Sequence, residues 1–167
     1  MSMQPISRRG FLMATALATA APAVALAADP YAASPFRKLS DAEWKQRLPE
    51  ASYEVLRHED TERPGSSPLL KEKRKGVFAC AGCDLPLFAS ETKYESGTGW
   101  PSFWKPLDNA IGETKDTTFG MTRTEVHCRR CGGHMGHVFD DGPKPTGLRY
   151  CIDGFGLVFH PAGPQAS

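Results

Sequence analysis

Two pairs of cysteines with the same short spacing constrain the fold of this chain more than any other feature. Cys80 and Cys83 form the first pair, Cys128 and Cys131 form the second, and 44 residues (84–127) separate them. A two-residue gap lets a tight turn aim both thiolates at one ion, and two such pairs are typical of a tetrathiolate zinc site with Zn–S distances of ~2.3 Å. The long separation exceeds that of a compact zinc ribbon, so we expect two distant hairpins joined by one structural Zn²⁺.

Disulfide bonds are the main alternative for these four cysteines, because an oxidising compartment would favour their pairing. A single CxxC pair could also act as a redox dithiol. Either alternative requires a separate explanation for each pair, whereas one closed zinc site explains both and adds folding free energy to a small domain. We therefore favour zinc, with a ligand set that includes His127 or His134 as a less favoured variant.

The first 27 residues have the features of an export signal. Arg8 and Arg9 precede an apolar, Ala-rich run that ends in small residues near Ala27, as a signal peptidase requires. This pattern resembles a twin-arginine signal, which implies that the twin-arginine translocase carries the folded protein to the periplasm. An uncleaved membrane anchor is the alternative, but the run is close to the ~20-residue minimum, consists mostly of Ala and contains a proline. We expect residues 1–27 to be removed.

The rest of the chain predicts one β-rich domain. Residues 28–39 read as a linker, residues 40–162 as the domain and residues 163–167 as a C-terminal tail, and the 167-residue length is typical of one domain. Sixteen Gly and fourteen Pro in a chain that is 40% apolar predict one core with many turns and few long helices. Loss of the leader would leave 18 basic against 19 acidic side chains, which lacks the positive charge typical of nucleic-acid binding.

Hydrophobic patterning predicts short helices followed by short strands. Ser40 and Glu43 form a capping box at the start of a helix, Pro49 ends it or begins another, and a second helical stretch covers residues 51–58. Further on, short apolar runs alternate with turn residues, which is typical of antiparallel strands. These runs are residues 77–79, 85–88, 137–139, 148–152 and 157–159. We therefore expect a mainly β (α+β) fold in which two small antiparallel sheets enclose the core and N-terminal helices pack outside.

Cys151 lies outside the two pairs, and its neighbours indicate a nucleophile more than a buried inert thiol. If its segment is a strand, Arg149, Cys151 and Asp153 share one face because side chains alternate. The cation of Arg149 would favour the thiolate, which is the form that attacks. Upstream, His134 and His137 lie beside a glycine-rich turn and are candidates for acid–base work.

Three sequence blocks resemble the signatures of one enzyme family. The blocks are SGTGWPSF at 96–103, CGGHMGHVF at 131–139 and GPKPTGLRYC at 142–151. They resemble those of the peptide-methionine (R)-S-oxide reductases, the B-type methionine sulfoxide reductases, and the resemblance extends over roughly residues 40–160. It implies reduction of methionine-R-sulfoxide in oxidised proteins, a β-tent type of architecture, structural zinc at the two cysteine pairs, and a thioredoxin-like or other thiol as reductant.

The resemblance also implies a role for each site residue. A sulfoxide becomes a good electrophile only when its oxygen is protonated, so the reaction needs an acid near the oxygen and a thiolate near the sulfur. Cys151 would attack the sulfur and become a sulfenic acid. His134 and His137 would supply the acid, and Trp100 would pack its ring against the methyl group of the substrate. The residues that would support the thiolate, the histidines or bound water are Arg149 and Asp141.

Two positions depart from the family pattern. Many members have a resolving cysteine where this chain has Thr98, and the four paired cysteines are assigned to zinc, so we expect an external thiol to reduce the sulfenic acid. Many members have Asn where this chain has Asp153. A carboxylate there should raise the pKa of the thiol by like-charge repulsion, unless Arg149 pairs with it or it is protonated. We expect slower chemistry or a higher pH optimum, with function retained.

A non-catalytic exported zinc module that binds a protein partner is the alternative from another functional class. It explains the cysteine pairs and Trp100, but it leaves the run from Arg149 to Cys151 and the two histidines without a role. A thiol–disulfide oxidoreductase is a third possibility, which a free thiol at Cys80 or Cys128 would distinguish. We expect the exported protein to be a monomer.

Overall fold

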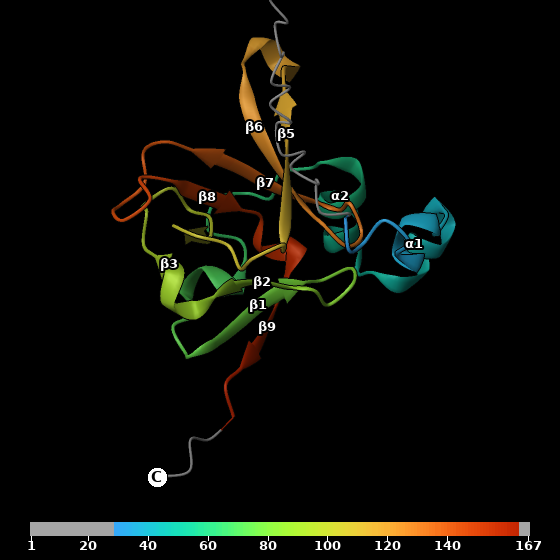
Figure 1. Cartoon of the computed structure of the whole chain (residues 1–167), viewed down its shortest axis with the longest axis horizontal. Coiled ribbons are helices and arrows are strands. Elements are labelled where there is room, and N and C mark those ends of the chain that lie inside the picture. Colours follow the sequence, from blue (N-terminus) through green and yellow to red (C-terminus); the bar gives the residue numbers. More distant parts are fainter. Residues whose placement is uncertain (1–28, 164–167) are drawn as a thin grey trace, which may run out of the picture.

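Two antiparallel sheets with helices outside them make up the fold (Figure 1), as the sequence predicts. The computed structural model describes residues 29–163, so the predicted leader and the end of the predicted tail lie outside the described residues. The smaller sheet has the order β2-β1-β9, with β1 Gly76–Cys80, β2 Pro86–Ala89 and β9 Leu157–Pro161. The six-stranded sheet has the order β3-β4-β8-β7-β6-β5. Its strands are β3 Lys93–Tyr94, β4 Ser102–Phe103, β5 Ile111–Asp116, β6 Arg123–Cys128, β7 His134–Phe139 and β8 Arg149–Ile152.

The two helices begin where the sequence predicts. Helix α1 spans Asp41–Arg47, and its capping box is formed: the backbone N–H of Ser40 donates to Glu43 Oε2 at 2.7 Å, and that of Glu43 donates to Ser40 Oγ at 3.4 Å. Helix α2 spans Glu50–His58 with Pro49 as its N-cap, where the missing N–H of proline costs no helical hydrogen bond. Short 3₁₀ turns complete the helical structure: η1 Pro35–Lys38, η2 Pro68–Lys71, η3 Ser90–Thr92, η4 Thr118–Gly120 and η5 Gly154–Gly156. Within residues 29–163, no helix combines the length and apolar character needed to span a membrane.

Aromatic packing between the sheets forms the core. Phe88 of β2 stacks on Phe103 of β4 with ring centroids 4.3 Å apart, and Phe78 of β1 meets the same ring edge-on at 5.1 Å. All three rings are fully buried. Because β4 also pairs with β8, this packing fixes the strand that carries Cys151 against the smaller sheet.

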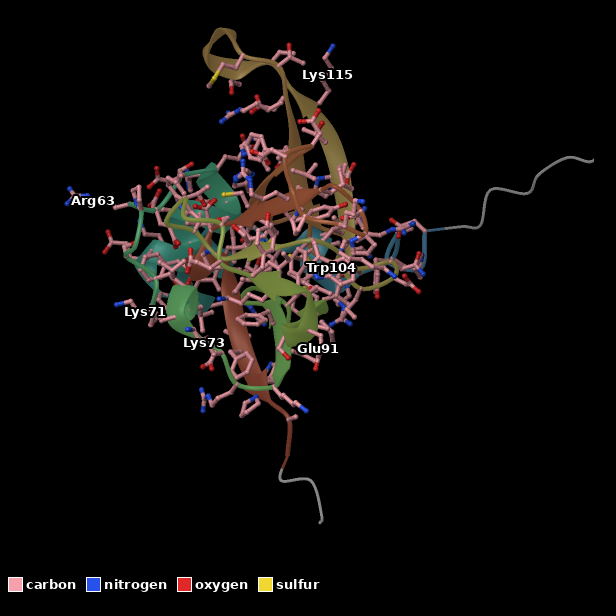
Figure 2. All side chains as sticks on the ribbon, turned by 90° about the vertical axis from the view of Figure 1, so that its left-hand side faces the viewer. Arg63, Lys71, Lys73, Glu91, Trp104 and Lys115 are labelled. Carbon is pink, nitrogen blue, oxygen red and sulfur yellow. The ribbon has the colours of Figure 1, made fainter. Side chains whose placement is uncertain are left out.

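The β5–β6 hairpin projects from the body of the molecule (Figure 1), and Lys115 lies on it (Figure 2). These two strands are not predicted from the sequence. Strand β5 is exposed or half-buried along its whole length, so it lacks the apolar alternation by which a half-buried strand is recognised. The hairpin nevertheless contributes one residue, Arg123, to the pocket that contains Cys151.

Candidate active site

Strand register brings the reactive side chains into one row across the six-stranded sheet. Cys151 of β8 is directly opposite Ser102 of β4 on one side and His137 of β7 on the other, and His137 is opposite Glu125 of β6. Residues directly opposite one another point to the same face of a sheet. At Gly136 a side chain would collide with the Cys151 carbonyl oxygen, so glycine permits the close approach of β7 to β8 beside Cys151.

A pocket of about 160 Å³ opens over this row. Its lining brings four of the predicted site residues together, namely Cys151, His137, Trp100 and Asp153. The remaining lining residues are Thr61, Arg123, Gly136 and Phe139. Three other predicted residues are not part of this lining: His134, Arg149 and Asp141.

Burial is the main influence on the Cys151 thiol, and it raises the pKa of that group. The hydroxyl of Thr98, 4.0 Å from Sγ, and the cation of Arg149 both lower the pKa, whereas the carboxyl of Asp153 raises it. The effect of Asp153 has the sign expected from the sequence, but desolvation of the thiolate is larger. The Cys151 thiol therefore depends on its hydrogen-bond and charge partners to ionise.

Arg149 is held by Asp141 and does not pair with Asp153 among the described residues. Its Nε and Nη2 donate to the two oxygens of Asp141 at 2.8 and 2.9 Å, and its guanidinium lies 4.4 Å from the centre of the Phe139 ring. This two-pronged pair lowers the pKa of Asp141. Asp141 thus acts on the site through Arg149, because it fixes the cation that lowers the pKa of Cys151.

His137 has a charged partner that the sequence analysis missed. Its Nε2 lies 2.9 Å from Asp116 Oδ2, and Arg123 Nη2 lies 2.6 Å from the same oxygen. Hydrogen bonds from Thr118, together with that from His137, hold the pKa of Asp116 well below its usual range, so the carboxylate is ionised and accepts from the imidazole. Burial lowers the pKa of His137, and Asp116 opposes this shift. The sequence signal for the Asp116–Arg123 pair was the opposite charge of the two residues on either side of the short turn η4.

We expect Asp116→Asn to lower turnover at pH 7 roughly ten-fold, because the neutral amide no longer supports a protonated His137. The pKa of His137 should fall further. The pH at which activity is lost on raising the pH should therefore be lower in the variant. Measuring turnover against pH for both proteins tests this. The exposed His160–Asp84 pair, 2.6 Å long, provides the matched control Asp84→Asn. An equal loss at every pH, with no displacement of the profile, would contradict the assignment.

His134 is not part of this lining and lies between two carboxyl groups. It is 4% exposed, its Nδ1 is 2.9 Å from Glu125 Oε1, and its Nε2 is 3.9 Å from Asp153 Oδ2. Its ring meets that of His137 at a centroid distance of 5.5 Å. His137 therefore lines this pocket and His134 does not, but both histidines line a second pocket of about 540 Å³.

Asp153 follows the end of β8 and is 3% exposed. Its backbone N–H donates to the carbonyl of Met135 at 2.8 Å, and its Oδ1 accepts from the backbone N–H of Glu62 at 3.2 Å. Burial raises the pKa of Asp153 to about 7, and the nearby charge of Glu62 adds to the shift. Asp153 is therefore neutral in much of the population at pH 7. A protonated Asp153 does not repel the Cys151 thiolate.

Asp153→Asn should increase reactivity only on the alkaline side of pH 7. Above this pH the native carboxylate is charged and raises the pKa of Cys151, so its removal should increase thiol alkylation roughly three- to ten-fold, with no gain below about pH 6. A raised carboxyl pKa lowers the stability of the wild type as pH rises from 3.8 towards 7. The free energy of unfolding of the variant at pH 8 should therefore exceed that of the wild type by about 2–4 kcal/mol. Alkylation rates and denaturant melts against pH test both effects, with exposed Asp108→Asn as control. A gain independent of pH would exclude this explanation.

Trp100 is positioned by Glu62, which the sequence analysis did not single out. Its Nε1–H donates to the Glu62 carbonyl at 3.1 Å, while Glu62 Oε2 accepts from the backbone N–H of Phe155 at 2.9 Å. Glu62 is 7% exposed, and burial raises its pKa. One buried residue, Glu62, therefore connects Trp100 in the pocket lining to the segment that follows Cys151.

The four paired cysteines meet in one buried cluster. Their sulfur atoms all lie within 4.8 Å of one another, with 3.6 Å between Cys80 and Cys131 and 3.5 Å between Cys83 and Cys128. Four thiolates arranged tetrahedrally at ~2.3 Å from Zn²⁺ would lie ~3.8 Å apart, so the donor set fits. All five cysteines of the chain are free in the structure, and no histidine belongs to the cluster within residues 29–163.

The cluster joins the two sheets, as the spacing of the pairs predicts. One pair lies at the β1–β2 turn of the smaller sheet and the other at the β6–β7 turn of the larger sheet. Hydrogen bonding to Cys128 raises the pKa of Cys131, while hydrogen bonding from Cys131 keeps the pKa of Cys128 well below its usual range. Sulfurs that share protons in this way cannot all ionise together without a cation. A bound metal ion would remove that restriction.

Comparison with known proteins gives one consistent result. The family model described as "SelR domain" matches residues 48–161. A protein of Agrobacterium fabrum named "Peptide methionine sulfoxide reductase MsrB" is 51% identical over 129 residues, which cover 77% of this chain and 96% of that protein. Proteins of the same name from Leptospira interrogans and Pseudomonas putida are 51% and 54% identical; they cover 72% and 71% of this chain, and the matches include 92% and 90% of their own lengths.

The family match spans both cysteine pairs and every residue of the pocket lining. The relatives are matched over at least nine-tenths of their length, so the similarity is not confined to one motif. The chain belongs to the SelR-domain family of peptide-methionine (R)-S-oxide reductases.

Proposed function

We propose that this enzyme reduces the R epimer of methionine sulfoxide through nucleophilic attack by the Cys151 thiolate. The observation that carries the proposal is the pairing of Cys151 with His137 across β8 and β7, on the floor of a pocket walled by Trp100 and Phe139. A cysteine thiol and an imidazole thus face the same small space. Neither group alone would account for the reaction.

The chemistry balances with one proton. The thiolate attacks the sulfoxide sulfur while the oxygen is protonated, the S–O bond of the substrate breaks, and the oxygen ends on the cysteine as a sulfenic acid. The substrate sulfur gains two electrons and Cys151 loses two. Methionine leaves with its thioether restored.

His137 is the acid that we propose. With its Nε2–H donated to ionised Asp116, the protonated ring still carries a second N–H at Nδ1 that it can give to the substrate oxygen. Burial lowers the pKa of His137, which makes its protonated form a stronger acid. His134 and Arg149 act through neighbours: His134 lies between Glu125 and Asp153, and Arg149 lowers the pKa of the nucleophile.

The pocket favours a methionine sulfoxide side chain that projects from a protein surface. A volume of about 160 Å³ accommodates the end of such a side chain and little more. The ring of Trp100 supplies an apolar surface for the methyl group, and its indole N–H is already bound to the Glu62 carbonyl. We infer that the rest of the substrate polypeptide stays outside.

An external thiol completes the cycle in this proposal. Thr98 occupies the position where many family members have a resolving cysteine, and its hydroxyl lies 4.0 Å from Cys151 Sγ. The other four cysteines lie in the buried cluster. A thioredoxin-like or other thiol would attack the Cys151 sulfenic acid and release water, and a second thiol would reduce the mixed disulfide. The reductant must therefore reach into the same pocket as the substrate.

We further propose that the cluster holds structural Zn²⁺ and that the twin-arginine translocase exports the protein to the periplasm as a monomer. Four buried sulfurs with the spacing of a tetrahedral site support zinc. The Arg8–Arg9 motif and the apolar run after it support export. Cell fractionation of the full chain beside an Arg8→Lys/Arg9→Lys variant tests the route: retention of the variant in the cytoplasm supports it, and unchanged export contradicts it.

Resolved epimers of a blocked methionine sulfoxide, with dithiothreitol as reductant, test the central proposal. Consumption of the R epimer alone, with a sulfenic acid trapped at Cys151 by a 1,3-diketone when reductant is withheld, is the expected result. Consumption of both epimers, or a trapped sulfenic acid at another cysteine, would refute the proposed chemistry.

A further inference from the structure

Three hydroxyl groups form a chain from the nucleophile to a backbone carbonyl. Thr98 Oγ1 lies 4.0 Å from Cys151 Sγ and 2.8 Å from Ser96 Oγ, which lies 2.7 Å from Ser102 Oγ. Ser102 is fully buried, and its hydroxyl donates to the Trp100 carbonyl at 3.1 Å. The chain therefore runs from the reactive sulfur to the backbone of the aromatic residue that walls the pocket.

The carbonyl end fixes the direction of every hydrogen bond in this chain. A carbonyl only accepts, so Ser102 must donate to Trp100, and each serine hydroxyl has one hydrogen. Ser102 then accepts from Ser96, and Ser96 has no hydrogen left for Thr98. The single hydroxyl hydrogen of Thr98 can therefore point either to Ser96 or to Cys151, but never to both.

These two orientations correspond to the two protonation states of Cys151. When Cys151 is a thiol, its S–H can donate to Thr98, whose hydrogen then points to Ser96. When Cys151 is a thiolate it can only accept, so Thr98 must turn its hydrogen to the sulfur. Ser96 then still accepts from the backbone N–H of Thr98 at 3.4 Å. Because an amide carbonyl does not take up the proton, the chain reorients and does not conduct a proton away.

Other charges around Cys151 do not replace this contact. Arg149 opposes the effect of burial on the pKa of Cys151, and Asp153 adds to it. The titratable or charged groups near the sulfur are Arg149 and Asp153 from its own segment, His137 from β7, Arg123 from β6 and Tyr94 from β3. All of them would remain in place if the Thr98 hydroxyl were removed.

We propose that Thr98 is a positioning residue whose hydroxyl turns from Ser96 to Cys151 when the thiolate forms, and that Ser96 and Ser102 set this two-position device. The inference rests on the proposed role of Cys151 as nucleophile and deepens it. Thr98 would stabilise the attacking thiolate at the place where many relatives carry a second cysteine.

The test is the pH dependence of Cys151 alkylation by iodoacetamide in the metal-loaded protein, for the wild type and three variants. Thr98→Val keeps the shape but removes the hydroxyl, so the midpoint should rise by about one pH unit, the worth of a hydrogen bond to a charged group. Thr98→Ser keeps the hydroxyl and should restore the wild-type midpoint. Ser96→Ala removes the acceptor that the Thr98 hydroxyl uses only in the thiol state, so the midpoint should fall by about half a unit.

The opposite signs expected for two adjacent members of one chain distinguish the device from a general packing role, which would move both variants in the same direction. Shifts of the same sign, or an unchanged midpoint in Thr98→Val, would overturn the proposal. Alkylation requires no sulfoxide, so it reports on the device separately from the reaction. A wild-type protein that failed to reduce methionine-R-sulfoxide while showing these shifts would refute the proposed chemistry and leave the device standing.

Discussion

Cys151→Ser is expected to lower turnover of methionine-R-sulfoxide by at least roughly 1,000-fold, because a serine hydroxyl stays protonated at neutral pH and attacks sulfur poorly. The half-buried side chain and its neighbours should accept serine without rearrangement, since oxygen is smaller than sulfur. Turnover with dithiothreitol and with a thioredoxin-like reductant should fall equally. The comparison of initial rates at several substrate concentrations checks this result.

Metal content and thermal unfolding provide the control for this variant. Both should match the wild type, because Cys151 lies in the pocket and the cluster that could hold a metal is formed by the other four cysteines. Residual turnover within ten-fold of the wild type, in protein of intact fold, would mean that a different group attacks the sulfoxide. The catalytic reading of the pocket would then be wrong.

Cys128→Ser is expected to release the metal and lower the unfolding free energy by more than about 3 kcal/mol, because a buried cluster that joins two sheets would lose one of four ligands. Cys128 is fully buried at the end of β6 and 3.5 Å from Cys83 of the opposite hairpin. Zinc content, expected at about one ion per wild-type chain for a closed four-ligand site, should fall with the melting temperature. Chemical denaturation with and without a chelator measures the effect.

Cys151→Ser is the matched control for Cys128→Ser, since both replace one sulfur by one oxygen. The expected pattern is reciprocal: one variant loses activity and keeps its metal, and the other loses its metal and stability. A wild-type protein that contains no metal and is insensitive to chelator, or a Cys128→Ser variant as stable as the wild type, would contradict a structural metal site.

The elements that the sequence predicted are those whose signals are local. The capping box at Ser40 and the apolar runs of β1, β2, β8 and β9 depend on neighbours a few residues apart, and the structure has all of them. The two cysteine pairs are equally local, and their common spacing was enough to predict one shared site. The family blocks added the expected roles of Cys151 and Trp100.

Long-range packing decided the rest of the site. Asp116 and Arg123 came to His137 on strands with no apolar pattern, and Glu62 reached Trp100 from 38 residues away in the chain. The raised pKa of Asp153 follows from its burial, which no spacing in the sequence reveals.

By itself, the sequence determined the chemical groups available to this protein: four paired cysteines that could bind a metal, a fifth cysteine outside the pairs, and two nearby imidazoles. Only the tertiary structure decided which of these groups face one another. It placed Cys151 opposite His137 and within reach of Thr98, because strand register and hydroxyl geometry are set by pairing between distant segments. It also brought His134 to the face of the sheet that carries His137, since a bulge between β6 and β7 pairs His134 with His127.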